Sequence, residues 1–235
     1  KRQQEIIPIA AYAAAGNLEK LKTAINNGLN GELSLNDIKE IVVQMYAYTG
    51  FPRSINAINT SLAAANNRPD NSYKTGEEAK IVPESNKYQK GKENVETLFG
   101  KSDAKAPYET FAPAIDTFLK EHLFCDIFER GVLSFQDREL ATISALASIS
   151  GVDPMLTAHM TAAMNTGLTE AQIEEFISII KTIIGTKEAD NAQRILNKIT
   201  KKNSDTTKRT DLDSIFAQGE PNPYGKFFTG QTYLN

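Results

Sequence analysis

Apolar residues recur at intervals of three and four positions along almost the whole of this 235-residue chain. The clearest runs lie at residues 35–49 and 173–184. Because an α-helix completes a turn about every 3.6 residues, this spacing gives each segment one apolar face, which must pack against another element. Only the C-terminal end departs from the pattern. The sequence therefore predicts an all-α fold.

Short polar motifs and glycines predict where the helices begin and end. Three pairs place an oxygen-bearing side chain three residues before an acidic or amide side chain: Ser34-x-x-Asp37, Ser134-x-x-Asp137 and Thr169-x-x-Gln172. Such pairs satisfy the free N–H groups of a first helical turn. Glycines, which suit the left-handed geometry of a helix C-cap, follow the periodic segments at positions 16, 28, 50, 151, 167 and 185.

Three segments near the N-terminus correspond to three later segments. LKTAINNGL (21–29) corresponds to MTAAMNTGL (160–168), IKEIVVQMYAYTG (38–50) to IEEFISIIKTIIG (173–185), and QQEIIPIAAYAAAG (3–16) to RELATISALASISG (138–151). Three matches in the same order indicate an internal duplication. We therefore expect two tandem helical repeats, at residues 1–65 and 111–200, packed as one unit.

The remaining segments are polar. Residues 66–110 are rich in Asn, Lys, Glu, Ser and Gly and are predicted to form a surface linker with one short helix near 87–99. Residues 201–235 form a tail whose ending, EPNPYGKFFTGQTYLN, contains the only plausible strand. We expect an extended arm onto a neighbouring subunit or the first strand of a β domain. A solvated linker is also indicated by the basic cluster Lys198, Lys201, Lys202, Lys208 and Arg209.

Composition argues against several classes of protein. The net charge of −3 gives no basic field for nucleic acid, and no run of roughly eighteen apolar residues predicts a membrane span. A single cysteine, Cys125, excludes an internal disulfide framework and a cysteine-based zinc cluster. The motifs of P-loop, dinucleotide-binding, zinc-protease and serine-hydrolase proteins are missing. The chain begins at Lys1, which leaves both a cytoplasmic and a periplasmic location open.

His159, one of two histidines, is the leading candidate for chemistry. On a helix, its neighbours on the same face are Met155, Leu156, Ala162 and Ala163, so the ring lies on an apolar face with small side chains beside it. Glu139 shares a face with Ile143 and Leu146 and also points inward. Two buried ionisable groups on consecutive helices can meet and shift each other's pKa values. The alternatives are a structural His–Glu pair without catalysis, and a Glu139 paired with Arg138 or Arg130.

Other candidate residues carry weaker signals. Gln44 and Tyr48 share a helical face, where a tyrosine hydroxyl could orient a substrate carboxylate, although aromatic residues at helical spacing usually form core. His122 is predicted at the surface or at an interface. Cys125 is predicted to be a small buried apolar residue.

Two stretches resemble the carboxymuconolactone decarboxylase family. One is LFCDIFERGVLSFQDRELATISALASISGVDPMLTAHMTAAMNTGLTEAQIEE (123–175), which carries the family's aromatic segment with Arg, its Arg-Glu helix start, and its His before Ala-x-Asn-x-Gly. The other is IKEIVVQMYAYTGFPRSINAI (38–58), with the family's Tyr-x-Gly-x-Pro ending. The resemblance implies two tandem helical repeats like those of alkyl hydroperoxide reductase D, assembling into a homo-oligomer such as a dimer, trimer or hexamer. The tail in turn resembles the segment that precedes the cupin domains sometimes fused to members of this family.

The resemblance carries over unevenly between the two copies. Glu139 and His159 occupy the family's acid and histidine positions, whereas the first copy has Gln4 and Lys20 there. The cysteine positions of the related thiol peroxidases fall on Val152 and Met155, so a peroxidase would lack its nucleophile. We expect one site per chain, with Glu139 and His159 from the second copy and Gln44 and Tyr48 from the first.

The resemblance and the residues together predict a lyase or isomerase that needs no cofactor or metal. Its substrate would be a small-molecule carboxylate or lactone. His159 would shuttle a proton, Glu139 would orient it, and the substrate carboxylate would be held by Tyr48, Gln44 or Arg138. Two alternatives are a peroxidase without the cysteine pair and a non-enzymatic helical module for oligomerisation. No nucleic-acid or membrane partner is expected.

Overall fold

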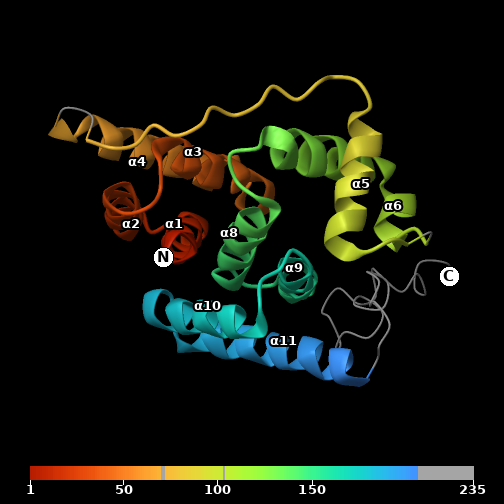
Figure 1. The fold of residues 1–235 in the computed structure, drawn as a ribbon. Coiled ribbons are helices and arrows are strands. Elements are labelled where there is room, and N and C mark those ends of the chain that lie inside the picture. Colours follow the sequence, from red (N-terminus) through yellow and green to blue (C-terminus); the bar gives the residue numbers. More distant parts are fainter. Residues whose placement is uncertain (70–71, 103, 206–235) are drawn as a thin grey trace.

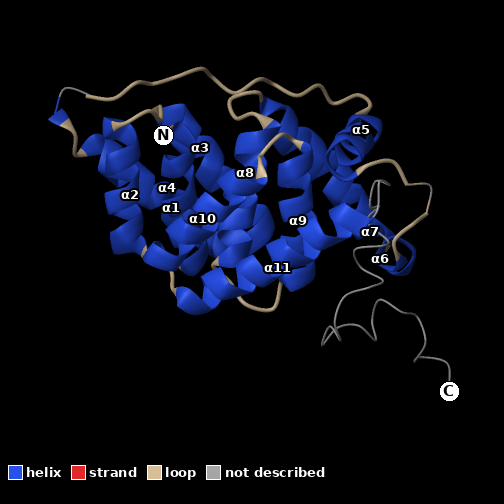
Figure 2. Cartoon of the chain, turned by 60° about the horizontal axis from the view of Figure 1, so that its bottom comes forward, coloured by secondary structure: helices blue, strands red, loops and turns tan. Residues whose placement is uncertain are grey.

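The computed structural model describes residues 1–69, 72–102 and 104–205, and within these residues every regular element is a helix (Figures 1 and 2). Their order is α1 (Arg2–Ala15), α2 (Leu18–Asn30), α3 (Leu35–Gln44), α4 (Tyr46–Asn66), α5 (Lys87–Phe99), α6 (Pro107–Phe111), α7 (Pro113–Thr117), the π-helix η2 (Phe118–Ile127), the 3-10 helix η3 (Phe128–Arg130), α8 (Phe135–Ala147), α9 (Asp153–Asn165), α10 (Glu170–Ile183) and α11 (Thr186–Asp205). The all-α prediction is confirmed.

The predicted helix starts lie where the polar motifs place them. Ser34 and Asp37 form a reciprocal capping box at α3, and Thr169 and Gln172 form another at α10. The Ser134 hydroxyl accepts a hydrogen bond from the backbone N–H of Asp137 at the start of α8. These caps fix where each apolar face begins, and so they set which residues of α3, α8 and α10 point into the core.

One of the predicted glycine helix ends is wrong. Gly28 lies inside α2, where an added Cβ would meet the Leu33 side chain at 3.0 Å. Close packing, not a turn, therefore explains this glycine. Gly185 follows the end of α10 as predicted, but it lacks the positive φ of a left-handed cap, whereas Gly16 has φ 74° and bonds back to the last turn of α1.

The centre of the molecule is the contact between α1 and α8 (Figure 1). Small side chains face this contact, which lets the two helix axes approach closely: Ala10, Ala14, Ala141 and Ala145 are all buried. One apolar cluster joins Ile6 and Ile9 of α1 to α2, α3 and α4. A second joins Ile7 and Ala11 of the same helix to α8, α9, α10 and α11. Because α1 contributes to both cores, the two groups of helices share one interior.

The predicted linker helix is confirmed as α5, and it is part of the core. Leu98 and Phe99 at its C-terminal end pack with Phe124 and Phe128 in a third apolar cluster, which also includes α9. The segment before α5 is tied to α3 by two backbone hydrogen bonds, from the Leu35 N–H to the Lys74 carbonyl and from the Asn36 N–H to the Thr75 carbonyl. Although residues 66–110 are polar in composition, this segment therefore includes a helix whose C-terminal end packs in the apolar core.

The C-terminal boundary differs from the expected one. Helix α11 continues to Asp205, past residue 200, where the second repeat was expected to end. The predicted strand of the tail falls outside the described residues. Helices α1–α4 and α8–α11 follow one another in the positions of the two predicted copies; the duplication itself stays a prediction.

Among the described residues, no helix combines the length and the apolar character needed to cross a bilayer.

Candidate active site

Glu139 and His159 meet in the interior, as the sequence predicts. Glu139 lies in the second turn of α8, which is buried from Asp137 to Ala147, and His159 lies in the middle of α9. The His159 Nδ1 and the Glu139 Oε2 are 2.8 Å apart. Glu139 is fully buried, while 7% of His159 is exposed. With Nδ1 donating to the carboxylate, Nε2 is the ring nitrogen that can exchange a proton with another molecule.

Two aromatic rings enclose the His159 imidazole. Tyr48 and Phe99 each lie edge-on to it, with ring centroids 5.4 Å away in both cases. Tyr48 comes from the first turn of α4, and Phe99 is the last residue of α5. Sequence reasoning found Tyr48 but missed Phe99, because a single aromatic residue at the end of a predicted linker helix carries no signal of what it will touch.

A break in α4 places Tyr48. Gly50 adopts φ 79° and ψ 161°, a conformation essentially restricted to glycine, so the first turn of α4 is set at an angle to the rest. Tyr48 is half-buried as a residue, and its hydroxyl is buried and has no hydrogen-bond partner among the described residues. Burial raises the pKa of Tyr48 far above its ordinary value, and the Glu139 carboxylate raises it further, whereas nearby Thr142 and Arg138 oppose the rise. The hydroxyl therefore stays protonated and can donate a hydrogen bond.

Arg138 and Gln44 form a buried network beside the pair. Arg138 is fully buried, and its Nη1 donates to the Gln44 Oε1 at 3.0 Å. The Gln44 Nε2 donates to the Arg138 carbonyl and to the Thr142 hydroxyl, at 2.9 and 2.8 Å. Both the oxygen and the nitrogen of the Gln44 amide are thus bonded within the chain. These bonds suit a side chain that holds Arg138 in place.

Glu40 is the acidic member of this network, and sequence reasoning missed it. Its carboxylate accepts a hydrogen bond from the Arg138 Nη2 at 3.1 Å and from Arg130 through Nε and Nη2. Burial lowers the pKa of Arg138, and the Glu40 carboxylate opposes that fall. Both arginines that could have paired with Glu139 therefore bind Glu40, which leaves His159 as the ionic partner of Glu139.

Three buried polar atoms around this site lack a hydrogen-bond partner among the described residues: the Tyr48 hydroxyl, the Arg138 Nε and the Glu139 Oε1. Most buried polar groups in proteins are bonded, and leaving one unbonded costs about 1–3 kcal/mol. Three of them on neighbouring residues provide two donors and one acceptor for a small polar molecule. We take these atoms, with the His159 ring, as the candidate active site.

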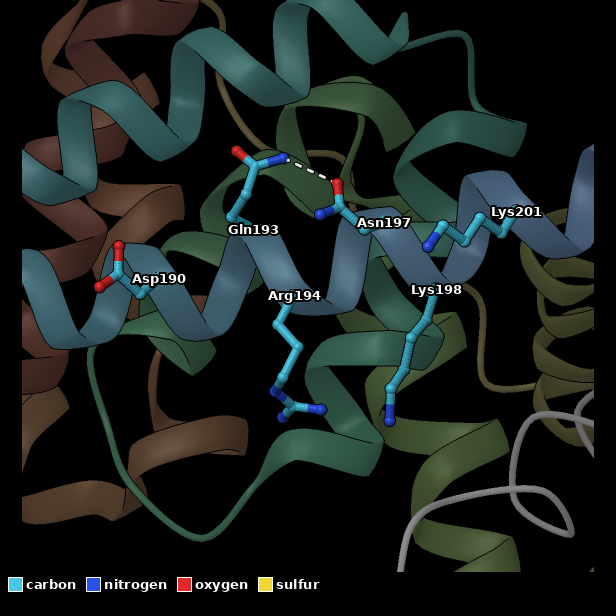
Figure 3. A pocket seen from close by; sticks show the side chains of 6 residues that line it. All are labelled: Asp190, Gln193, Arg194, Asn197, Lys198 and Lys201. Atoms are coloured by element: carbon cyan, nitrogen blue, oxygen red, sulfur yellow. Dashed lines mark hydrogen bonds between the residues drawn. The ribbon is translucent and has the colours of Figure 1, made fainter.

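Two cavities among the described residues lie elsewhere. One, of about 410 Å³, follows α11, and the side chains drawn in Figure 3 all belong to that helix: Asp190, Gln193, Arg194, Asn197, Lys198 and Lys201. The other, of about 360 Å³, lies between α3 and α4 and includes Glu40 and Arg130 in its lining. Neither is lined by Glu139 or His159; the second reaches the site only through Glu40.

The remaining candidates for chemistry lie apart from the His159 site. Cys125 is buried in η2, and burial, reinforced by the Asp126 charge, raises the pKa of its thiol. His122 is mostly exposed and bonds to Asp126, as predicted for a surface residue. Among the residues that the structure describes, no group of three or more His, Cys, Asp or Glu side chains is arranged to hold a metal ion.

The second half of the sequence matches a known family. Residues 113–198 match the Carboxymuconolactone decarboxylase family. This match assigns the segment 113–198 to that family. The match covers Arg138, Glu139 and His159, whereas Gln44 and Tyr48 lie outside it. Among curated proteins, none matches the chain. Together with the all-helical fold, the match places the chain in the superfamily that carboxymuconolactone decarboxylases share with alkyl hydroperoxide reductase D.

Proposed function

We propose that this carboxymuconolactone decarboxylase family member is a lyase or isomerase that acts on a small carboxylate or lactone without a cofactor. The observation that carries the proposal is the buried His159–Glu139 pair at 2.8 Å, next to the unbonded Tyr48 hydroxyl and Arg138 Nε. A proton carrier beside two fixed donors is the arrangement that enolate chemistry requires.

Each side chain has a separate task in the proposed reaction. Loss of CO2 breaks a carbon–carbon bond, and the electron pair left behind forms an enolate whose oxygen becomes negative. The Tyr48 hydroxyl and the Arg138 Nε–H can donate to that oxygen or to the substrate carboxylate. His159 delivers the proton to carbon from Nε2 and is restored by a proton from water; in an isomerisation it would first remove a proton. Glu139 holds the ring and stabilises its charged form.

Gln44 acts in this proposal as a positioning residue. Among the described residues, its side chain bonds to Arg138 and Thr142 alone, and both belong to the network behind the site. The proposed roles of Tyr48 and Arg138 as substrate-binding residues rest on their unbonded donors, which Gln44 does not have.

The test is the decay of carboxymuconolactone absorbance with purified wild type and with His159→Gln. Loss of a general acid or base typically lowers the rate about a hundredfold or more, so we expect that fall in kcat. His122→Gln is the matched control, because it changes the other histidine, which is exposed and bonded to Asp126, and should leave the rate unchanged. Equal rates for wild type and His159→Gln would remove His159 from the mechanism.

A redox reaction has less support in this chain. The related thiol peroxidases need two cysteines at the positions of Val152 and Met155, and the buried Cys125 thiol, with its raised pKa, is a poor nucleophile. Peroxide turnover that survives Cys125→Ser would contradict the proposed lyase or isomerase chemistry.

A further inference from the structure

One face of α4 exposes four large apolar side chains to solvent. Phe51 is 63% exposed, Ile55 50%, Ile58 39% and Leu62 58%. Their spacing of four, three and four residues places them in one narrow stripe along the helix. A contiguous exposed patch of apolar side chains usually marks an interaction surface, because water solvates it poorly.

The surface around this α4 stripe is uncharged. Within residues 51–67 the sole charged side chain is that of Arg53, which bonds to the Ala14 carbonyl of α1. A helix that binds a membrane surface carries lysine or arginine beside its apolar face, whereas the centre of a protein–protein interface is depleted of charge. The neighbours of the stripe that are exposed and uncharged include Asn59, Ala63 and Asn66.

The spacing of the α4 stripe is the same in both directions along the helix. When two copies of α4 lie antiparallel about a two-fold axis, Phe51 of one copy meets Leu62 of the other, and Ile55 meets Ile58. Every large apolar side chain of the stripe then has an apolar partner, and no like charges meet. A stripe that is complementary to itself fits a second copy of the same chain.

A cavity beside the α4 stripe adds to the surface that a second copy can cover. It lies between α3 and α4, has a volume of about 360 Å³, and is lined in part by Ile58 and Leu62. A stable interface buries about 800 Å² on each partner, and four partly exposed side chains provide only part of that area. The pairing must therefore also cover the mouth of the cavity and the uncharged neighbours of the stripe. The charged residues of the lining balance one another: Lys39, Arg130, Glu40 and Glu78.

We propose that α4 forms the interface of a two-fold dimer of this chain, in which the stripe of Phe51, Ile55, Ile58 and Leu62 packs antiparallel against its own copy. Stacking of the Phe51 ring on Tyr46, with centroids 4.7 Å apart, holds the end of the stripe in place. The dimer does not rest on the proposed lyase or isomerase function.

The test is the molecular mass of the purified full chain, measured by size-exclusion chromatography with light scattering over a range of concentrations. Wild type should have twice the 25.9 kDa mass of one chain. Ile55→Lys and Ile58→Glu should each raise the dimer dissociation constant by about a hundredfold or more, because each buries a charge against an apolar side chain twice per dimer. Circular dichroism should show that both variants stay folded, since both positions are exposed.

Mixing the two variants tests the antiparallel pairing itself. In a mixed dimer the two introduced charges are opposite and face each other, while the second contact remains isoleucine against isoleucine. The mixture should therefore recover dimers that neither variant forms alone. A mixture that stays monomeric would overturn the proposal, as would a monomeric wild type at every concentration or an unchanged mass in Ile58→Glu.

A second exposed apolar stripe supplies the matched control. Phe111, Ile115 and Phe118 are 92%, 45% and 63% exposed, but their stripe is broken between α6 and α7 and has the Asp116 charge next to it. Ile115→Glu introduces the same charge as Ile58→Glu and should leave the dimer intact. Loss of the dimer in Ile115→Glu but not in Ile58→Glu would place the interface on this second stripe and overturn the proposal.

Discussion

At the scale of single residues, the burial of Glu139 means that its carboxylate needs a compensating partner. An isolated carboxylate in a protein interior is costly unless a charge or hydrogen bond compensates it. Its Oε2 is bonded to His159, its Oε1 has no partner among the described residues, and the nearby arginines are bound to Glu40. The position of the Glu139 carboxylate therefore depends on its hydrogen bond to His159.

Tyr48 gives a prediction about alkaline stability. Burial and the Glu139 charge raise its pKa above the ordinary value of about 10. A raised pKa means that the folded state keeps the proton longer than the unfolded state does. The contribution of Tyr48 to stability is therefore complete below pH of about 10 and is lost as the pH rises further. Wild type should lose more stability between pH 9 and 11, taken as roughly the range around that value, than Tyr48→Phe does.

The measurement is urea unfolding of both proteins at each pH. At neutral pH we expect Tyr48→Phe to be as stable as wild type or more stable by about 1 kcal/mol, because the hydroxyl it removes is buried and unbonded. Parallel stability curves for the two proteins across the alkaline range would contradict the raised pKa. A large loss of stability at neutral pH would show that the hydroxyl is bonded in solution.

At the scale of elements, α5 places the Phe99 side chain at the site, which the sequence did not predict. Asn94 fixes this helix, since its Nδ2 donates to the Phe124 carbonyl at 2.7 Å and to the Glu129 Oε1 at 2.8 Å. At its C-terminal end, the Leu98 carbonyl accepts a hydrogen bond from the Asn165 side chain of α9. The position of Phe99 beside His159 therefore depends on contacts along the whole of α5.

Asn94→Ala should loosen α5 and weaken the fold. The substitution leaves the Phe124 carbonyl in the interior without its donor, which costs about 1–3 kcal/mol. We expect a lower midpoint in thermal unfolding and faster hydrogen exchange in residues 87–99. Gln89→Ala is the control, because Gln89 is exposed on the same helix and, among the described residues, its side chain bonds to Glu93 alone. Equal effects of the two substitutions would mean that the Asn94 hydrogen bonds do not hold α5.

Local rules explain which parts of the fold the sequence could predict. Ser34, Ser134 and Thr169 start helices through hydrogen bonds to residues three positions away. Both bonded residues lie within the short motif, so the sequence alone predicts the helix start. Glu139 and His159 lie on consecutive helices, and their apolar faces indicated that they can meet, although an arginine partner for Glu139 stayed open. Glu40 and Phe99 gave no such signal, because their importance comes from partners far away in the sequence. The oligomeric state and the partition into repeats stay predictions.

At the scale of the whole molecule, one arginine bridges the starts of two helices in different halves of the chain. The Arg2 guanidinium bonds to Asp37, the partner of Ser34 in the capping box of α3, at 2.8 Å, and to Asp137 in the first turn of α8. Both aspartate side chains are largely buried, whereas a third of the arginine side chain is exposed. Together with the shared interior along α1, this bridge predicts that the described helices unfold as one cooperative unit.

Arg2→Gln tests that coupling. Removing the cation leaves two largely buried carboxylates without their charge partner, and partial exposure of Arg2 moderates the effect, so we expect a loss of about 1–2 kcal/mol. In urea unfolding followed by circular dichroism, wild type and variant should each show one transition, with the midpoint of the variant lower. Lys1→Gln is the control, since Lys1 lies in an exposed pair with Glu32 at 3.9 Å and should shift the midpoint little. Two transitions in wild type would mean that the halves fold separately, and an unchanged midpoint in Arg2→Gln would mean that the bridge contributes nothing to holding them together.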